Sequence, residues 1–355
     1  MGKQSEQSFK IVDFLRFPLI MVVVLIHCNY PASGLSDVQI SAPIFYTIQQ
    51  FLQYHIYTVA VPLFFFISGY LFYRNGIPNI SVLKEKLQKR VHTLLVPYLL
   101  WNTVGMILFL LKASPILIKY FPQYSDFTPT ISNLLEGYIG LHYSPDLLPY
   151  DISLWFIRNL LFVLIFTPVI DLLFKILKEY SIIIPFLFTL FWPDFFYNFY
   201  SSLFYFMLGA SIPISGIDLS SIIQKYKYYF IIFWIINLIL LSSVSRPILC
   251  DLLYLSCICL GIFSALYIGY LFILRGIAIY PMLAKSTFFI YAFHALYPSV
   301  AIRIGTIIIP PTSEIAAFLS YLLIFILEAG LSFIVFLLLN RLIPKTISIF
   351  CGYRS

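Results

Sequence analysis

The sequence predicts an all-α, polytopic membrane protein with about ten transmembrane helices and with both termini in the cytoplasm. Composition gives two reasons: 61% of the 355 residues are hydrophobic, and only 10% are charged. Ordinary soluble domains are about 45–50% apolar and about 25% charged, so this chain could not cover its own surface in water. A soluble enzyme, a disordered chain, a collagen and a nucleic-acid module are therefore excluded. The third reason is the distribution of basic residues along the chain.

Ten segments approach the length that a helix needs to cross the hydrocarbon core, about 20 mostly apolar residues. The first, second, fourth, sixth and eighth of them carry the strongest signals, and the fifth is short enough to be a half-span. The predicted spans are Ile11–Asn29, Ile56–Tyr73, Val91–Leu111, Ile152–Phe174, Ser181–Trp192, Phe195–Ile214, Tyr226–Ser243, Leu249–Leu274, Ser286–Ile302 and Ile315–Leu342.

The basic residues sort by side of the membrane in this layout. With the N-terminus in the cytoplasm, 16 of the 22 Lys and Arg residues fall in inner segments and four in outer segments, while Arg16 and Arg158 lie within spans. Inner segments of membrane proteins carry such an excess. The net charge of +7 is thereby explained without a nucleic-acid partner, and an even number of spans returns the C-terminus to the cytoplasm.

We expect one integral membrane domain over residues 1–355, because the sequence shows no internal repeat, no low-complexity tract and no appended soluble domain. The first span is as short as a signal peptide, but charged residues interrupt it and no Ala-x-Ala cleavage site follows. Two outer segments are longer, Tyr30–His55 and Lys112–Asp151, and the second is predicted to contain a surface helix around Ser132–His142. Either segment caps an outer pocket or is a solvated connector.

Polar residues inside the first span are the strongest candidates for a functional site, because a charged side chain at the centre of a membrane helix costs at least about 2.5–3.5 kcal/mol. Asp13 and Arg16 are three residues apart and share a helix face. Arg16 and His27 are eleven residues apart, which places them on one stripe and about 16–17 Å apart along the axis. The alternatives are that Arg16 snorkels to the inner interface and that His27 is an outer-interface or helix-packing residue.

Three further candidates lie in later spans. Arg158 lies near the outer end of the fourth span, where it is either a site residue or an interfacial arginine beside Trp155. His294 is in the middle of a span and needs a hydrogen-bonding partner. Ser68 begins a Ser-Gly pair on an aromatic helix, which allows close approach either of a ligand or of another helix.

A metal site is not predicted. The five cysteines lie mostly in apolar runs, which implies no disulfide framework. Cys257 and Cys259 would point to different faces of one helix, which does not suit a shared metal ion. The sequence has no Gly-x-Ser-x-Gly, no Walker loop and no His-Glu-x-x-His.

Together these motifs resemble the acyltransferase type 3 family of integral membrane acyltransferases. The pair Arg16 and His27, separated by ten residues, resembles the Arg-x10-His signature of the family's first helix. The segment Asp13–Arg16 resembles the start of that helix in the family. Thr93 departs from the family pattern, because many members carry a second arginine at this position, three residues after Arg90. Four later segments are similar to family motifs: Val61–Tyr70, Lys89–Tyr98, Ser153–Arg158 and Ser286–His294.

The resemblance implies transfer of an acyl group, usually acetyl, from cytoplasmic acyl-CoA to a hydroxyl of a cell-surface or lipid-linked carbohydrate. It also implies a bacterial inner membrane location, a lipid environment and no metal cofactor. A homo-oligomer is compatible with it. An anionic donor fits the basic inner face, where Arg is suited to phosphate through its planar fork. The residues expected to bind acyl-CoA are Arg16, Lys86, Lys89, Arg90 and Ser68, with Lys84 nearby.

His27 is the expected general base, since an imidazole with a pKa near neutrality can take a proton from an acceptor hydroxyl. Direct attack on the thioester and an acyl-histidine relay both remain open. Arg158 and His294 are expected to stabilise the oxyanion or to hold the acceptor, and Asp13 to fix Arg16. We expect the acyl arm to follow a protein-lined shaft between Arg16 and His27.

Two alternatives remain. A transporter or flippase would also place polar residues along an inner-to-outer stripe, but the sequence shows no internal repeat and no matching pair of broken helices. Within the enzyme class, the acyl group could be succinyl or longer, and the acceptor could be a peptide or an antibiotic. Labelled coenzyme A would separate the enzyme from the transporter.

Overall fold

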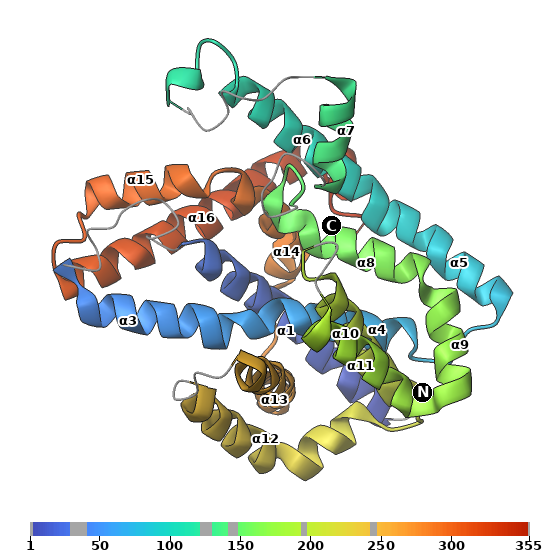
Figure 1. Ribbon diagram of the computed structural model, residues 1–355. Coiled ribbons are helices and arrows are strands. Elements are labelled where there is room, and N and C mark those ends of the chain that lie inside the picture. The colour runs from blue at the N-terminus through green and yellow to red at the C-terminus, as the bar shows by residue number, and fades with distance from the viewer. Residues whose placement is uncertain are drawn as a thin grey trace.

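The computed structural model describes residues 3–28, 41–120, 130–140, 148–192, 197–241 and 247–353, and these residues form helices and no β-strand (Figure 1). The all-α prediction is confirmed. The α-helices are α1 Lys3–His27, α3 Pro43–Phe51, α4 Ala60–Phe72, α5 Ile80–Arg90, α6 Val96–Lys112, α7 Ile131–Ile139, α8 Trp155–Ile165, α9 Thr167–Leu177, α10 Ile183–Phe191, α11 Phe199–Ile214, α12 Leu219–Leu241, α13 Pro247–Leu274, α14 Pro281–Phe293, α15 Pro298–Ile308, α16 Glu314–Leu342 and α17 Pro344–Phe350.

The ten expected spans are not confirmed. Among the described residues, four helical segments are long and apolar enough to cross a membrane, or up to seven if each of three bent helix pairs is one span. The four are Pro43–Phe72, Ile80–Lys112, Leu249–Leu274 and Glu314–Leu342. The side of the membrane on which each terminus lies stays a prediction.

Prolines account for the breaks in two of the expected spans. The expected span Ile152–Phe174 is broken near Phe166 by a bend of 60°, and Pro168 stands in the first turn of the next helix. The expected span Ser286–Ile302 is broken by a bend of 76°, after which Pro298 begins α15. Proline lacks the amide hydrogen that a continuing helix requires and restricts the residue before it, so each break is local in origin.

Two connectors contain more helix than expected. Part of the predicted loop Tyr30–His55 is helical, because α3 continues through the π-turn Leu52–Ile56 and the 3₁₀ turn Tyr57–Val59 into α4. The short span Ser181–Trp192 becomes α10, which belongs to the bent segment that starts at Thr167. The surface helix predicted near Ser132–His142 is present as α7.

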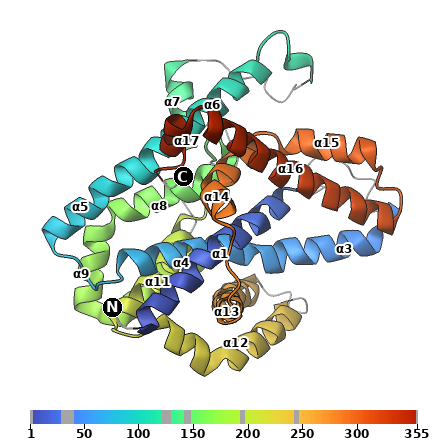
Figure 2. The same ribbon diagram turned by 180° about the vertical axis from the view of Figure 1, so that it is seen from behind.

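Helix α1 is central, since it contacts α4, α12, α13, α14 and α16. In both views α15 lies alongside α16, and α12 lies alongside α13 (Figures 1 and 2). Helices α4 and α11 approach each other closely. A Cβ atom at Gly69 would lie 1.9 Å from the carbonyl oxygen of Phe206, and a Cβ atom at Gly209 would lie 1.9 Å from the carbonyl oxygen of Phe66. Each glycine therefore admits the backbone of the other helix.

Candidate active site

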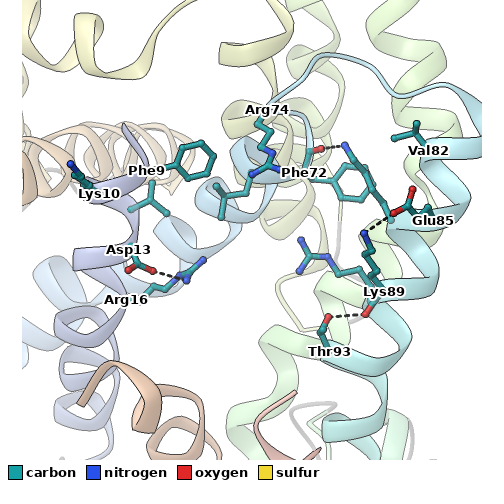
Figure 3. A pocket seen from close by; sticks show the side chains of 14 residues that line it. Phe9, Lys10, Asp13, Arg16, Phe72, Arg74, Val82, Glu85, Lys89 and Thr93 are labelled. Atoms are coloured by element: carbon teal, nitrogen blue, oxygen red, sulfur yellow. Dashed lines mark hydrogen bonds and ion pairs between the residues drawn. The ribbon is translucent and has the colours of Figure 1, made fainter. Parts of the chain in front are cut away.

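A basic cavity of about 730 Å³ lies between α1 and α5. Figure 3 shows Asp13 and Arg16 of α1 on one side, Glu85 and Lys89 of α5 on the other, and Arg74 reaching across. Its lining residues are Phe9, Lys10, Val12, Asp13, Arg16, Leu71, Phe72, Arg74, Val82, Glu85, Lys86, Lys89, Arg90 and Thr93. Six of these are Lys or Arg and two are acidic, so the described walls carry a strong excess of positive charge.

Both acidic side chains of the basic cavity are already paired. Asp13 accepts a hydrogen bond from Arg16 at 2.9 Å, and Glu85 accepts one from Lys89 at 2.6 Å. Lys86 instead donates to the carbonyl oxygen of Phe72, and the Arg74 guanidinium lies 5.4 Å from the centre of the Phe9 ring. The cationic excess therefore stays available to an anion, for which guanidinium and ammonium groups are the usual partners.

Most of the residues expected to bind the donor lie together. Arg16, Lys86, Lys89 and Arg90 all line the basic cavity, as does Thr93. Two expected members are elsewhere: Lys84 is exposed on α5, and Ser68 lines neither of the two cavities described here. The Ser68-Gly69 pair instead lies where α4 meets α11.

The sequence interpretation did not single out Arg74 or Lys10 as site residues. Arg74 follows the end of α4 and reaches the basic cavity because the chain turns there, with Gly76 at a φ of +77°. The sequence did carry one sign of this role, because Arg74 is a cationic residue that follows directly after an aromatic span.

A second cavity of about 410 Å³ surrounds the side chain of His27, and we call it the histidine cavity. Helices α1, α4, α8, α10, α11, α13 and α14 contribute to it. Its lining residues are Val23, Ile26, His27, Tyr57, Thr58, Val61, Pro62, Phe65, Ser153, Trp155, Phe156, Thr189, Tyr197, Asn198, Ser201, Ser202, Tyr205, Asp251, Tyr254, Leu255, Ile258 and Tyr291. Aromatic rings and small polar groups dominate this wall.

The structure brings His27 and His294 together. Their ring centres are 5.1 Å apart, and the ring planes meet at 66°. The His294 ring is fully buried, and its Nδ1 lies 3.0 Å from the carbonyl oxygen of Ile290. A carbonyl can only accept, so Nδ1 carries the hydrogen and the neutral ring presents Nε2 as an acceptor. Among the described residues, that Nε2 atom has no hydrogen-bonding partner.

Aromatic contacts continue from this histidine pair along the cavity wall. His294 contacts Tyr291 at 6.4 Å between ring centres, and Tyr291 contacts Phe156 at 6.3 Å. Phe156 packs edge to face on Phe65 at 4.6 Å. Trp155 contacts both Phe65 at 6.3 Å and Tyr197 at 5.1 Å. The rings thus support one another and fix the shape of the cavity.

Polar groups of the histidine cavity are held by their neighbours. Asp151 caps the short helix before α8, where its carboxylate accepts hydrogen bonds from the amide and the hydroxyl of Ser153, at 3.2 and 2.8 Å. Ser202 accepts a hydrogen bond from Asn159 at 3.1 Å. These bonds anchor the short helix before α8 and join α8 to the first turn of α11.

Arg158 does not line the histidine cavity in this structure. Its guanidinium donates a hydrogen bond of 2.8 Å to the carbonyl oxygen of Ile139 at the end of α7, and its Nε donates to Asn159. It therefore connects α8 to α7 beside the cavity, and its expected contact with an oxyanion or acceptor stays a prediction.

The shaft expected between Arg16 and His27 is not open. Arg16 lines the basic cavity and His27 lines the histidine cavity, and neither cavity is lined by both residues. Leu19 and Ile20, which lie between them on α1, are 7% and 5% exposed. The common stripe on α1 is present, but close packing separates its two ends.

Comparison with known proteins places the chain among acyltransferases. The chain matches the family model described as an acyltransferase domain over residues 9–341. It is 22% identical over 171 residues to the succinoglycan biosynthesis protein ExoH of Rhizobium meliloti (strain 1021), a match that covers 46% of this chain and 42% of that protein. No solved structure matches the chain. Since the family match spans nearly the whole chain and both cavities, the protein belongs to the acyltransferase type 3 family.

Proposed function

We propose that this acyltransferase moves an acyl group, most simply acetyl, from cytoplasmic acyl-CoA to a hydroxyl of a cell-surface or lipid-linked carbohydrate in the bacterial inner membrane. One observation carries the proposal: the single helix α1 lines a basic cavity with its N-terminal part, up to Arg16, and an aromatic cavity with its C-terminal end, which includes His27. The printed name of the relative, a succinoglycan biosynthesis protein, supports a polysaccharide acceptor.

The basic cavity is the proposed site for the phosphates of the donor. Arg16 is held in place by Asp13, and Arg74 and Arg90 add two more guanidinium groups to the same wall. Planar guanidinium groups bind phosphate oxygens through two parallel hydrogen bonds. A dianionic or trianionic donor would offset the charge excess of this cavity, which a neutral ligand would leave unopposed.

The histidine cavity is the proposed site of chemistry. The His27 imidazole takes the proton of the acceptor hydroxyl while the oxygen attacks the thioester carbonyl carbon. The resulting tetrahedral intermediate collapses, the carbon–sulfur bond breaks, and the leaving thiolate takes the proton from the His27 imidazolium. The His294 ring packs against His27, with 5.1 Å between the ring centres, and so would help to orient the imidazole. An acyl-His27 intermediate would use the same groups.

Donor and acceptor can meet only if the packing between the cavities opens. Leu19 and Ile20 fill this region, and Pro18 lies inside α1 directly before them. A proline within a helix removes one backbone hydrogen bond and weakens the helix locally. We therefore place the opening at this turn of α1, where the acyl arm would displace the Leu19 side chain.

The test uses the full chain in lipid nanodiscs, with labelled acetyl-CoA and the glycans of the source cell as acceptors. The His27→Ala variant should lose transfer by at least about 100-fold, since it removes the general base. The Arg16→Ala variant should raise the KM for acetyl-CoA by about tenfold, as expected for loss of one charge-assisted hydrogen bond. Mass spectrometry of the glycans identifies the acyl group and the acceptor.

Matched controls are His55→Ala and Arg275→Ala, which line neither cavity. Both should retain wild-type transfer. Activity of His27→Ala within a few-fold of wild type would remove this residue from the mechanism. A change in acceptor affinity alone for Arg16→Ala would contradict its role in donor binding, and no consumption of labelled acetyl-CoA by the wild-type protein would favour a transporter.

A further inference from the structure

We infer that the sugar that reaches His27 is a pyranoside without negative charge, neutral or amine-bearing, and that Asp251 enforces this preference. The inference rests on the proposed function and goes beyond it, because it names the class of acceptor and a residue that selects it. Three features of the histidine cavity carry it: its aromatic faces, its charge and an unpartnered buried hydroxyl.

Aromatic rings supply the surface that a sugar ring needs. Eight of the described lining residues are aromatic, and Trp155 lies half-buried among them with Phe65 and Tyr197 as its ring neighbours. The C–H face of a pyranose packs on such rings, while its hydroxyls need polar partners at the edge. Ser153, Ser202 and Asn198 supply hydroxyl and amide groups around that edge. The cavity thus has the mixed apolar and polar lining typical of small-molecule sites.

The charge of the histidine cavity is opposite to that of the basic cavity. None of the described residues that line it is Lys or Arg, and Asp251, on the first turns of α13, supplies the one carboxylate among them. A sugar carboxylate or phosphate would find no counter-charge on this wall and would meet Asp251 as a like charge. Like charges brought together weaken binding and so exclude the wrong ligand. The two cavities thereby separate an anionic donor from an acceptor that carries no negative charge.

Tyr205 provides the third feature. Its side chain is 2% exposed and lines the cavity, yet its hydroxyl has no hydrogen-bonding partner among the described residues. A buried hydroxyl without a partner is unfavourable. The hydroxyl is shielded within the wall, so a hydroxylated ligand would reach it once the Tyr205 side chain turns toward the cavity. A sugar could then satisfy it, whereas an acyl chain or a lipid tail could not.

Binding is tested apart from catalysis, with the full chain in nanodiscs and no donor present. Probes are methyl glucoside, galactoside and mannoside, each paired with the uronate of the same ring. Quenching of Trp155 fluorescence, taken as the difference between wild type and Trp155→Phe, reports occupancy. At least one neutral probe should bind about tenfold more tightly than its uronate. Equal binding within every pair, or tighter binding of a uronate, would overturn the inference.

Asp251→Asn tests the selecting residue, because it keeps the size of the side chain and removes its charge. The preference for the neutral ring should fall from about tenfold to within about threefold, mainly through better binding of the uronate. The matched control is Glu179→Gln, an exposed carboxylate on neither cavity, which should keep the wild-type preference. An unchanged preference in Asp251→Asn would remove this residue from acceptor selection.

The same probes in the transfer reaction separate the two proposals. Selective binding of neutral sugars with no consumption of acetyl-CoA would contradict the acyltransferase mechanism and leave the sugar site standing. Acetyl-CoA consumption with transfer to uronates as fast as to neutral sugars would do the reverse. A wild-type protein that binds none of the probes contradicts the inference about the acceptor alone.

Discussion

At the residue scale, the histidine cavity depends on neighbours that set the orientation and protonation of its groups. The Ile290 carbonyl fixes the tautomer of His294, and Asp151 fixes Ser153. Asp151 itself is fully buried and precedes the helical segment that starts at Ile152. Burial raises the pKa of Asp151 to about 8, against an ordinary value of 3.8, because the charged carboxylate is poorly solvated there. The hydrogen bonds from Ser153 oppose this effect only in part.

This raised pKa predicts a loss of stability as the pH rises. Between pH 4 and 8 the unfolded carboxyl has released its proton and the folded one still holds it, so the folded state binds more protons. Stability therefore falls through this window, by up to about 1.4 kcal/mol per pH unit from this group. Thermal unfolding of the purified protein at pH 5 and pH 8 measures the effect. Asp151→Asn should be less pH-dependent, and an unchanged pH dependence in that variant would contradict the assignment.

At the element scale, the fold depends on how closely α4 and α11 approach. Gly69 and Gly209 each face the backbone of the other helix. A Cβ atom at either position would clash with that backbone, and no side-chain rotation could relieve the clash. Small residues at such positions are typical of helix packing in membranes. Since α4 and α11 both line the histidine cavity, their separation also sets its width.

Adding one methyl group at this contact should destabilise the protein. Gly69→Ala places a Cβ atom 1.9 Å from a carbonyl oxygen, so the helices must move apart, with an expected loss of about 1–3 kcal/mol. Gly330→Ala on α16 is the matched control, because a Cβ atom there meets no atom within 4 Å. Thermal unfolding in detergent compares the two. Equal stability of both variants would show that the α4–α11 contact adapts easily.

At the scale of the whole molecule, the two cavities have opposite chemistry and lie at the two ends of α1. If the charge distribution of the sequence sets the orientation, the basic cavity faces the cytoplasm, where acyl-CoA is made. The histidine cavity and α7 then lie toward the outer side. In the proposed mechanism, this arrangement would bring a cytoplasmic donor and an outer acceptor to the same histidine from opposite directions once the packing at Leu19 and Ile20 opens.

Cysteine labelling in intact cells tests this orientation. Ser81 on α5 and Ser132 on α7 are both exposed, so Ser81→Cys and Ser132→Cys form a matched pair. A membrane-impermeant maleimide should label Ser132→Cys in intact cells and Ser81→Cys only after the cells are opened. The wild-type chain gives the background from its five cysteines. The reverse labelling pattern would invert the orientation and exclude a cytoplasmic donor at the basic cavity.

Much of the site could be predicted from the sequence where one helix determines it. The spacing of Arg16 and His27 fixes their common stripe, because helix geometry is local. The cluster of Lys86, Lys89 and Arg90 follows in the same way from one short helix. Tyr205 and Asp251 could not be identified, because an aromatic or acidic residue near an apolar helix carries no sign of what it faces.

The sequence by itself determined that this protein is helical and membrane-embedded, since composition depends on solvation rather than on the details of packing. Only the tertiary structure decided that the His294 ring lies against His27 and that the stripe on α1 leads to two separate cavities. It also decided that one of these cavities is lined by aromatic rings and, among the described residues, by no Lys or Arg. These features arise from contacts between helices far apart in the chain, whose side-chain packing no local pattern specifies.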